Sequence, residues 1–200
     1  MRGAVLAGGA ASRFDGKPKG LEKVGGERIL DRVVRAMRET LGTDPILLAD
    51  PERAGEWDTD LDAVPDPIPE RGSLSGLYTA TALEESPVLV VAWDMPFVIP
   101  ELLTRLIDGA GEYDAFLPIS NAAGTCEPMC AVYGPACVDP IKAHIDDEDY
   151  RATGFHDDVR TGFLPFEQVE TLGEPATLFF NVNTPADLTR AEELWRARYA

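Results

Sequence analysis

Short apolar runs alternate with amphipathic stretches along most of the chain. Residues 29–41 carry apolar side chains at helical spacing, which predicts a helix. Residues 87–92, PVLVVA, are apolar and rich in β-branched side chains, which predicts a buried strand. The remaining predicted strands are residues 3–7, 45–49, 61–64, 114–119, 129–133, 168–172 and 178–182. Further helices are predicted at residues 74–85, 136–145 and 185–198, and residues 100–107 are predicted to begin another. Residues 52–57 are predicted to form an acidic loop or a short helix.

This alternation predicts an α/β fold in which helices cover both faces of a mostly parallel sheet. The C-terminal helix has Thr184 in the N-cap position, Pro185 as its first residue and Asp187 three residues after the cap. No linker or internal repeat interrupts the pattern, so we expect a single domain over residues 1–200. Residues 145–162 are polar and poorly periodic, which predicts a mobile loop beside a site.

The charge balance argues against two classes of partner. Asp and Glu number 35 against 18 Lys and Arg, so the formal net charge is -17 and the pI is about 4.4. A chain this acidic repels nucleic acids and anionic membrane surfaces. No apolar run approaches the ~18 residues of a membrane-spanning helix, and two glycines interrupt the N-terminal apolar run, unlike a secretory signal. We therefore expect a cytoplasmic protein with no nucleic acid and no membrane partner.

Three cysteines raise the question of a metal site. Cys126 and Cys130 are spaced unlike the usual zinc-binding pairs, and no second pair accompanies them. An odd number of cysteines also argues against a disulfide framework. We expect Cys126, Cys130 and Cys137 to be core residues.

The stretch AVLAGGAASRFDGKPKG, residues 4–20, begins as a predicted strand and ends as a basic, glycine-rich loop. Lys17, Lys19 and Lys23 are three of the four lysines in the chain, and Arg13 precedes them. The paired glycines let backbone N–H groups approach phosphate oxygens, and Arg13 and Lys19 supply positive charge. The loop lacks the G-x-x-x-x-G-K-[ST] and G-x-G-x-x-G orders, so it predicts a phosphate site of another kind. The alternative is that the glycines only turn the chain.

Other polar side chains follow the remaining predicted strands. Ligands of an open α/β sheet bind beyond the carboxyl ends of the strands, so these side chains should converge there. Asp94 is a hard oxygen ligand suited to Mg2+, and Asn183 could add a neutral oxygen. Asp66 follows the strand predicted at 61–64. Each has a structural alternative: Asp94 as a cap before a proline, and Asp66 and Asn183 as turn residues.

Three separated motifs resemble those of one known family. The stretch LAGGAASRFDGKPKG is similar to the L-A-G-G-x-x-x-R-[MF]-x-G-x-x-K signature of nucleotidyltransferases. Together with DMPF and FFNVNTPADL, it resembles the molybdenum cofactor guanylyltransferases over essentially the whole chain. The resemblance implies a Rossmann-like three-layer α/β/α fold of the nucleotide-diphospho-sugar transferase type. It also implies transfer of GMP from GTP to the phosphate of molybdopterin, with Mg2+ as cofactor and release of pyrophosphate.

The resemblance also implies roles at matching positions. The implied catalytic residues are Arg13, Lys19 and Asp94. The implied nucleotide-binding residues are Leu6, Ala7, Gly8, Gly9, Lys19, Asp66, Leu74, Ser75, Gly76 and Asp94. The implied metal ligands are Asp94 and Asn183, and the implied acceptor-binding residues are Asn181, Asn183 and Arg151. The segment CEPMCAVY stands where several family members carry His-Pro, so the acceptor side departs from the family pattern.

Other functions are compatible with these residues. The chain could use a different acceptor or nucleotide, as a cobinamide-phosphate guanylyltransferase, a molybdopterin cytidylyltransferase or a sugar-phosphate nucleotidyltransferase. It could also bind a nucleotide without catalysis, and the missing dinucleotide fingerprint argues against an oxidoreductase. The partners that the resemblance implies are the small molecules GTP and molybdopterin, with transient contact with molybdoenzyme maturation proteins as a further expectation.

Overall fold

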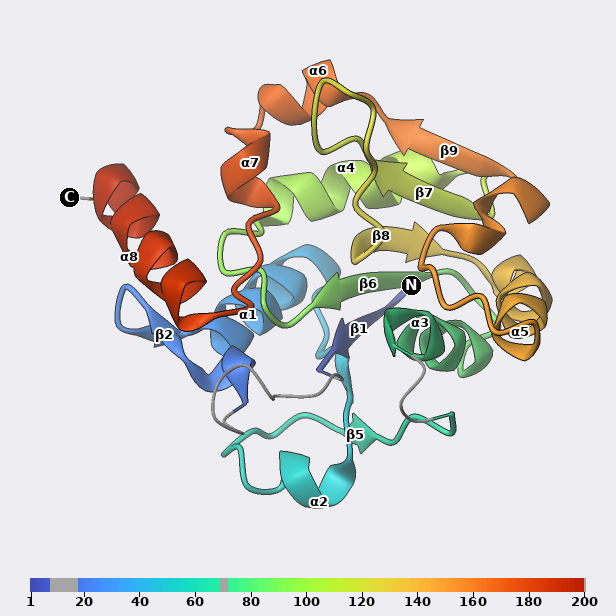
Figure 1. Ribbon diagram of the computed structural model, residues 1–200, viewed down its shortest axis with the longest axis horizontal. Helices are drawn as coiled ribbons and strands as arrows, with labels where there is room; N and C mark the ends of the chain where they lie inside the picture. The colour runs from blue at the N-terminus through green and yellow to red at the C-terminus, as the bar shows by residue number, and fades with distance from the viewer. Residues whose placement is uncertain (8–17, 69–71, 200) are drawn as a thin grey trace.

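The computed structural model describes residues 1–7, 18–68 and 72–199, and its centre is a seven-stranded sheet (Figure 1). The strands lie in the order β5 (Ala63–Val64), β4 (Ile46–Leu48), β1 (Arg2–Leu6), β6 (Val88–Ala92), β8 (Cys130–Tyr133), β7 (Ala115–Pro118) and β9 (Thr161–Leu164). Parallel pairing joins β5, β4, β1 and β6, and also joins β7 to β9, whereas β8 is antiparallel to both of its neighbours. The mostly parallel sheet predicted from the alternation of elements is confirmed.

Helices cover both faces of this sheet, which gives the expected three layers. They are α1 (Ile29–Leu41) and α4 (Pro100–Ala110) on one face, and α3 (Gly72–Ala82) and α5 (Val138–Asp146) on the other. Alternate residues of a strand enter opposite cores, because successive side chains point to opposite faces of a sheet. Val5 and Val91 pack with α1 and α4, whereas Ala4 and Val90 pack on the other side.

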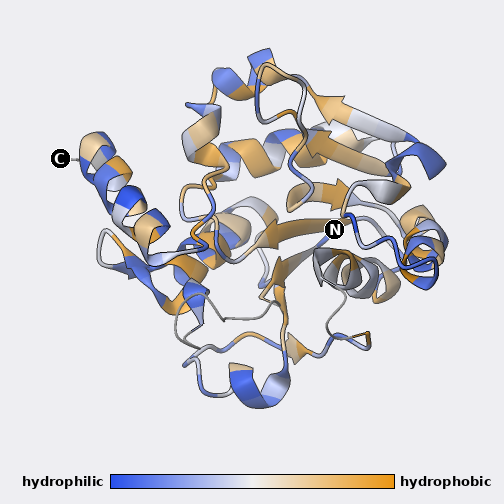
Figure 2. Cartoon of the chain, viewed as in Figure 1, coloured by the Kyte–Doolittle hydropathy of each residue, from blue (hydrophilic) through white to orange (hydrophobic). Residues whose placement is uncertain are grey.

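Hydropathy follows this architecture (Figure 2). The central strands are the most hydrophobic part of the chain, and α2, α5 and α8 carry hydrophilic residues on their outer sides. None of the described helices is long and apolar enough to cross a bilayer.

Apart from α8, the remaining elements are short. They are the 3-10 helices η2 (Lys19–Leu21), η3 (Pro135–Cys137) and η4 (Gly154–Asp158), the hairpin strands β2 (Lys23–Val24) and β3 (Glu27–Arg28), and the helices α2 (Pro51–Ala54), α6 (Phe166–Glu170), α7 (Pro175–Leu178) and α8 (Pro185–Tyr199). The β2–β3 hairpin lies against α8, where the Gly25 N–H donates to Glu192 Oε1 at 2.8 Å. A Cβ on Gly25 would lie 2.1 Å from the Trp195 ring, and φ there is +60°, so both space and conformation require glycine. This contact fixes the chain that follows η2.

The predicted cap of α8 is present. The Asp187 N–H donates to Thr184 Oγ1 at 3.2 Å, and the Thr184 hydroxyl donates to Asp187 Oδ2 at 2.9 Å. The Asn183 N–H donates to the same carboxylate oxygen at 3.0 Å. The cap therefore also fixes the backbone of Asn183, one of the residues implied as a metal ligand.

Two strands predicted near the C-terminus are wrong. Residues 168–172 fall at the end of α6, and residues 178–182 at the end of α7 and the chain that follows, whereas β9 lies in and just beyond the stretch predicted as a loop. A short apolar run does not distinguish a strand from a helix. The prolines indicated helix starts in both segments. Pro175 stands in the first turn of α7, and the Pro165 carbonyl at the start of α6 accepts the Val169 N–H at 3.1 Å.

The polar stretch 145–162 is held by ion pairs. His144 Nε2 lies 2.9 Å from Asp158 Oδ2, and His144 Nδ1 lies 3.2 Å from Asp149 Oδ2. The hydrogen bond to Asp158 and then that to Asp149 raise the pKa of His144. Burial instead lowers the pKa of His156 to about 4. The stretch contains η4 and the start of β9, so the prediction of a mobile loop is corrected.

The cysteines occupy the places expected of core residues. Cys130 and Cys137 are buried and Cys126 is half-buried. Burial raises the pKa of the Cys137 thiol to about 12, and it raises that of Cys130 as well. Both buried thiols therefore stay protonated and behave as small apolar side chains.

Candidate active site

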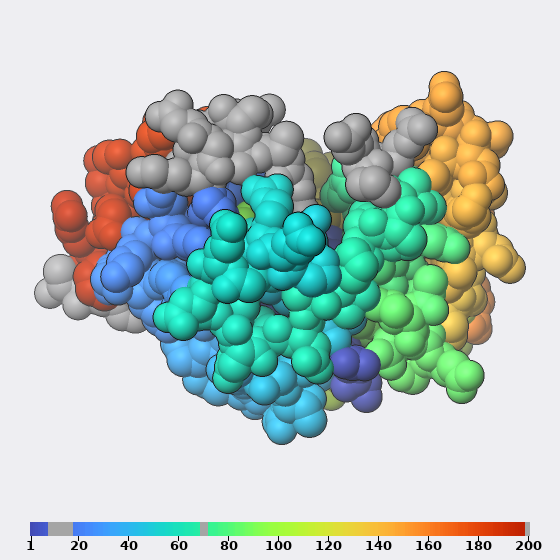
Figure 3. All heavy atoms as spheres, turned by 90° about the horizontal axis from the view of Figure 1, so that it is seen from below, coloured from blue at the N-terminus to red at the C-terminus, as the bar shows by residue number. Residues whose placement is uncertain are grey.

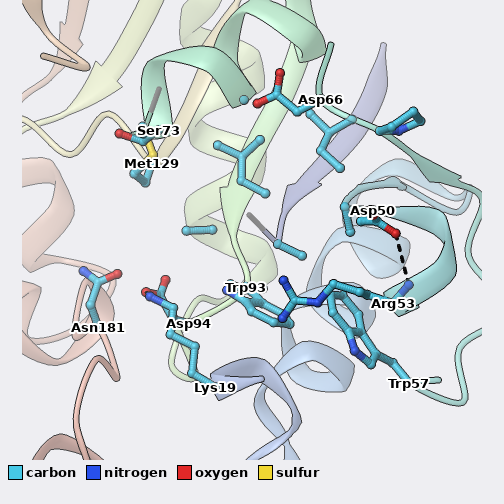
Figure 4. Close-up of a pocket in the computed structure, with 18 residues that line it drawn as sticks. Lys19, Asp50, Arg53, Trp57, Asp66, Ser73, Trp93, Asp94, Met129 and Asn181 are labelled. Atoms are coloured by element: carbon cyan, nitrogen blue, oxygen red, sulfur yellow. Dashed lines mark hydrogen bonds and ion pairs between the residues drawn. The ribbon is translucent and has the colours of Figure 1, made fainter. Parts of the chain in front are cut away.

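The carboxyl ends of β1, β4, β5 and β6 open into one cleft of about 980 Å³ (Figure 4). The described residues that line it are Leu6, Ala7, Lys19, Leu48, Ala49, Asp50, Arg53, Trp57, Pro65, Asp66, Gly72, Ser73, Gly76, Ala92, Trp93, Asp94, Met129 and Asn181. Seen from below in Figure 3, the cyan segment around α2 and β5 stands in front, between the blue N-terminal part and the green α3. The cleft lies at the edge where an open α/β sheet binds its ligands.

Leu6, the last residue of β1, and the following Ala7 line the cleft. The Ala7 N–H donates to the Leu48 carbonyl at 3.0 Å, and the Trp93 N–H donates to the Leu6 carbonyl at 3.1 Å. The end of β1 is thus anchored to the chain on both sides. The predicted phosphate-loop residues Gly8, Gly9, Arg13 and Lys17 lie outside the described residues.

Lys19 joins two of the other predicted site residues. Its ammonium donates to Asp94 Oδ2 at 2.5 Å and to Asn183 Oδ1 at 2.7 Å. The side chains of Asp94 and Lys19 are 8% and 22% exposed, so solvent screens this ion pair little. A positive charge therefore stands between the two oxygens that were implied as metal ligands. Three residues distant in sequence meet here, as expected, although the strand predicted before Asn183 is absent.

Asp94 is fixed through its backbone and keeps one carboxylate oxygen free. Its carbonyl accepts the Val182 N–H at 2.9 Å, which ties the chain after β6 to the segment before α8. Asp94 Oδ1 is buried and has no hydrogen-bond partner among the described residues. Such an oxygen is costly to bury unless a cation or a donor meets it. Together with Asn183 it fits Mg2+, which takes few protein ligands and keeps water and substrate phosphates as the others.

A second carboxylate, that of Glu127, does not line the cleft but interacts electrostatically with Asp94. Its Oε1 accepts the Met129 N–H at 3.0 Å. Burial raises the pKa of Glu127, and the negative charge of Asp94 raises it further. Its position three residues before the buried strand β8 was the only signal for it in the sequence.

Asp66 lines the cleft, but its carboxylate bonds to its own chain. Oδ1 accepts the Ile68 N–H at 2.9 Å and the Thr79 hydroxyl at 3.1 Å, and Oδ2 accepts the Ser75 hydroxyl. These bonds hold the first turns of α3 against the end of β5. Asp66 therefore positions the cleft wall, and its implied contact with a nucleotide stays a prediction.

Two residues of the implied nucleotide-binding set, Leu74 and Ser75, lie in the core beside the cleft. Both are 0% exposed, and neither lines the cleft. Successive residues of a helix point about 100° apart, so a segment of α3 cannot present all of its side chains to one side. Ser73 and Gly76 face the cleft instead.

Of the residues implied for the acceptor, Asn181 lines the cleft and Arg151 does not. Asn181 lies beside Asp94 in Figure 4, and its Nδ2 donates to the Phe179 carbonyl at 3.0 Å. The Arg151 side chain is 76% exposed, and its guanidinium donates to both carboxylate oxygens of Asp149 at 2.8 and 2.6 Å. The connection that carries Arg151 runs beside α5, away from the carboxyl end of β6 (Figure 1). Its implied acceptor role stays a prediction, and in this structure its charge pairs with Asp149.

Eleven of the described lining residues had not been singled out as site residues, and the larger or polar ones among them include Asp50, Arg53, Trp57, Trp93 and Met129. The Trp57 and Trp93 rings stack with their centroids 4.9 Å apart. The sequence held one usable signal for this wall. An aspartate followed by a proline, directly after a predicted strand, is typical of a helix start, and that start necessarily falls at the carboxyl edge of the sheet.

Gly20→Ala is expected to destabilise the protein, because a Cβ on Gly20 would lie 2.3 Å from Trp93 Cε3. Trp93 is 4% exposed and stacked on Trp57, so its ring has little room to move. Overpacking of this kind costs about 1–3 kcal/mol. Guanidinium unfolding measures the loss, with Gly55→Ala as a control whose Cβ meets only ordinary contacts. A Gly20→Ala protein as stable as the wild type would contradict this packing.

Comparisons with known proteins agree with one another. Residues 3–159 match the family described as MobA-like NTP transferase domain. The molybdenum cofactor guanylyltransferase of Rhizobium meliloti (strain 1021) is 34% identical, over 94% of this chain and 88% of that protein. The protein of the same name from Rhodopseudomonas palustris (strain HaA2) is 32% identical, over 95% and 90%. The crystal structure of molybdopterin-guanine dinucleotide biosynthesis protein A from Archaeoglobus fulgidus superposes with a TM-score of 0.82 at 26% identity, over 98% of this chain and 100% of that one.

Proposed function

The chain belongs to the MobA-like NTP transferase family, and we propose that it is a molybdenum cofactor guanylyltransferase. Such an enzyme transfers GMP from GTP to the phosphate of molybdopterin and releases pyrophosphate. The relatives of that name are similar to this chain over nearly its whole length. The structural observation that carries the proposal is the contact of Lys19 with Asp94 and Asn183 in the cleft.

The proposed reaction needs no nucleophile from the protein. An oxygen of the acceptor phosphate forms a bond to the α-phosphorus of GTP, and the bond from that phosphorus to the oxygen bridging to the β-phosphate breaks. Pyrophosphate leaves with the electron pair. A phosphate monoester is largely ionised at neutral pH, since its second pKa is about 6, so no general base is required. The protein aligns the two substrates and stabilises the charge that develops.

The residues of the cleft divide these tasks. Lys19, a point charge on a flexible stem, stabilises the negative charge that grows on the leaving pyrophosphate, and Arg13 shares that role. Asp94 and Asn183 would hold Mg2+, which neutralises triphosphate charge when it is bound. Asn181 lies beside Asp94 in the cleft, which supports a contact with the acceptor. With a nucleoside triphosphate as substrate, we place the enzyme in the cytoplasm.

Pyrophosphate release from GTP, CTP and ATP tests the proposal, with molybdopterin, cobinamide phosphate or glucose 1-phosphate as acceptor. We expect release with GTP and molybdopterin together, and loss of that release when EDTA removes the divalent cation. Faster release with CTP or with another acceptor would place the enzyme elsewhere among the nucleotidyltransferases. Nucleotide binding with no release under any pairing would contradict a catalytic role.

A further inference from the structure

Arg53 lines the cleft, and none of the described residues of opposite charge forms an ion pair with it. It belongs to α2, which begins directly after β4, and Figure 4 shows its guanidinium directed towards Trp93. Its side chain makes no hydrogen bond or ion pair within the described part of the chain. Most arginines of this chain form ion pairs with carboxylates, as expected where acidic residues outnumber basic ones. An unpaired guanidinium that faces a cleft is available to a ligand.

Asp50 stands next to Arg53 and is oriented by the start of α2. Its Oδ1 accepts the N–H groups of Glu52 at 2.9 Å and of Arg53 at 3.2 Å, as an N-cap does. Oδ2 accepts no hydrogen bond from the described residues, and Asp50 lines the cleft. The cap thus fixes a carboxylate acceptor and a guanidinium donor on one short helix.

The stacked rings of Trp57 and Trp93 lie beside this pair. Both are buried, with an angle of 30° between their planes. Leu48, Ala49 and Pro65 add apolar lining near the ends of β4 and β5. This end of the cleft therefore offers a mainly apolar wall with one charged donor and one charged acceptor, which suits a planar heterocycle with polar edges.

The two ends of the cleft suit the two ends of a nucleotide. Asp94 and Asn181 lie at one side of the view in Figure 4, and Asp50 and the backbone of Arg53 at the other. Phosphates meet the Lys19 and Asp94 end, so the base is left for the α2 end. We propose, on the basis of the proposed function, that Arg53 and Asp50 select guanine: Arg53 donates to O6 and N7, and Asp50 accepts from N1–H and the 2-amino group.

The chemistry of the bases makes this pair selective. Guanine presents two acceptors, N7 and O6, which match the fork of an arginine. Adenine and cytosine each present an amino donor where guanine has O6, so the guanidinium would face a donor. Inosine keeps N7, O6 and N1–H but lacks the 2-amino group, and it separates the contribution of Asp50 from that of Arg53.

Equilibrium binding of guanosine, inosine, adenosine and tripolyphosphate to Arg53→Met tests the proposal. We expect the wild type to bind guanosine more tightly than adenosine. In Arg53→Met the affinities for guanosine and inosine should fall about 5- to 150-fold, with adenosine and tripolyphosphate unchanged. The matched control is Arg105→Met, an exposed arginine of α4 that does not line the cleft and should change none of these affinities.

Asp50→Asn gives the second arm, because asparagine keeps the N-cap but loses the charge. Guanosine affinity should fall while inosine affinity changes less. Equal losses for tripolyphosphate and guanosine in Arg53→Met would place Arg53 on the phosphates and overturn the proposal, as would unchanged affinities. These outcomes do not depend on turnover: guanine selectivity without pyrophosphate release would leave this inference standing and remove the proposed function. Pyrophosphate release by the enzyme, together with unchanged guanine selectivity in Arg53→Met, would leave the proposed function standing and remove this inference.

Discussion

Asp94→Asn is expected to lower the rate of pyrophosphate release by about 10²–10³. The substitution keeps the shape of the side chain but removes its charge and leaves only one oxygen. The position is 6% exposed, and Asp94 Oδ1 is the buried carboxylate oxygen without a partner in the described chain, so a cation bound there loses its charged ligand. The rate is measured with saturating GTP and molybdopterin, and circular dichroism establishes that the variant is folded.

Asp147→Asn is the control for Asp94→Asn. Asp147 is an exposed carboxylate after α5 that does not line the cleft, so its removal changes the net charge by the same amount. We expect this variant to retain the wild-type rate. A folded Asp94→Asn enzyme that turns over as fast as the control would remove Asp94 from the metal site.

Lys19→Met is expected to act in opposite directions on two measurements. Turnover should fall by about 10²–10³, because the charge growing on pyrophosphate loses a cation. The affinity of the nucleotide-free protein for Mn2+ should rise at least about tenfold, because the ammonium now lies 2.5 Å from Asp94 Oδ2 and 2.7 Å from Asn183 Oδ1 and repels a second cation. Electron paramagnetic resonance of free Mn2+ measures this affinity without any turnover.

Lys142→Met provides the comparison for Lys19→Met. Lys142 lies on α5, is 41% exposed and pairs with Asp146, so neither turnover nor Mn2+ affinity should change. A Lys19→Met protein whose Mn2+ affinity stays unchanged or falls would show that the ammonium and the metal do not share these oxygens.

The fold was predictable wherever the hydrophobic pattern was long or strongly β-branched. Residues 29–41 coincide with α1, because Val33 and Met37 recur on one buried face over several turns. Residues 87–92 contain β6, which is buried on both faces. The strand predicted at residues 178–182 is absent for a physical reason. Val182 is buried against α8 and the β2–β3 hairpin and not in the sheet. Burial alone does not determine the backbone conformation.

The site was predictable only as far as topology places residues. Lys19 and Asp94 meet because the chain leaves the parallel strands β1 and β6 at a shared edge, whereas Asn183 reaches them on the segment between α7 and α8, which the Val182 N–H ties to the Asp94 carbonyl. A motif match identifies a segment but not the side of the helix that each of its side chains faces. Leu74 was therefore implied for the cleft although its side chain is in the core. The interpretation of Arg53 depends on its guanidinium having no ion-pair or hydrogen-bond partner among the described residues, which the sequence alone does not reveal.

A single-turnover reaction with GTP labelled at the α- or the γ-phosphate tests most directly whether this cleft performs nucleotidyl transfer. With molybdopterin present and enzyme in excess, we expect the α-label to appear in the pterin product and the γ-label in pyrophosphate, at equal rates. Omitting molybdopterin should leave both labels in GTP. Transfer of the γ-label to the acceptor, or loss of both labels from GTP at the same rate without an acceptor, would contradict the proposed reaction.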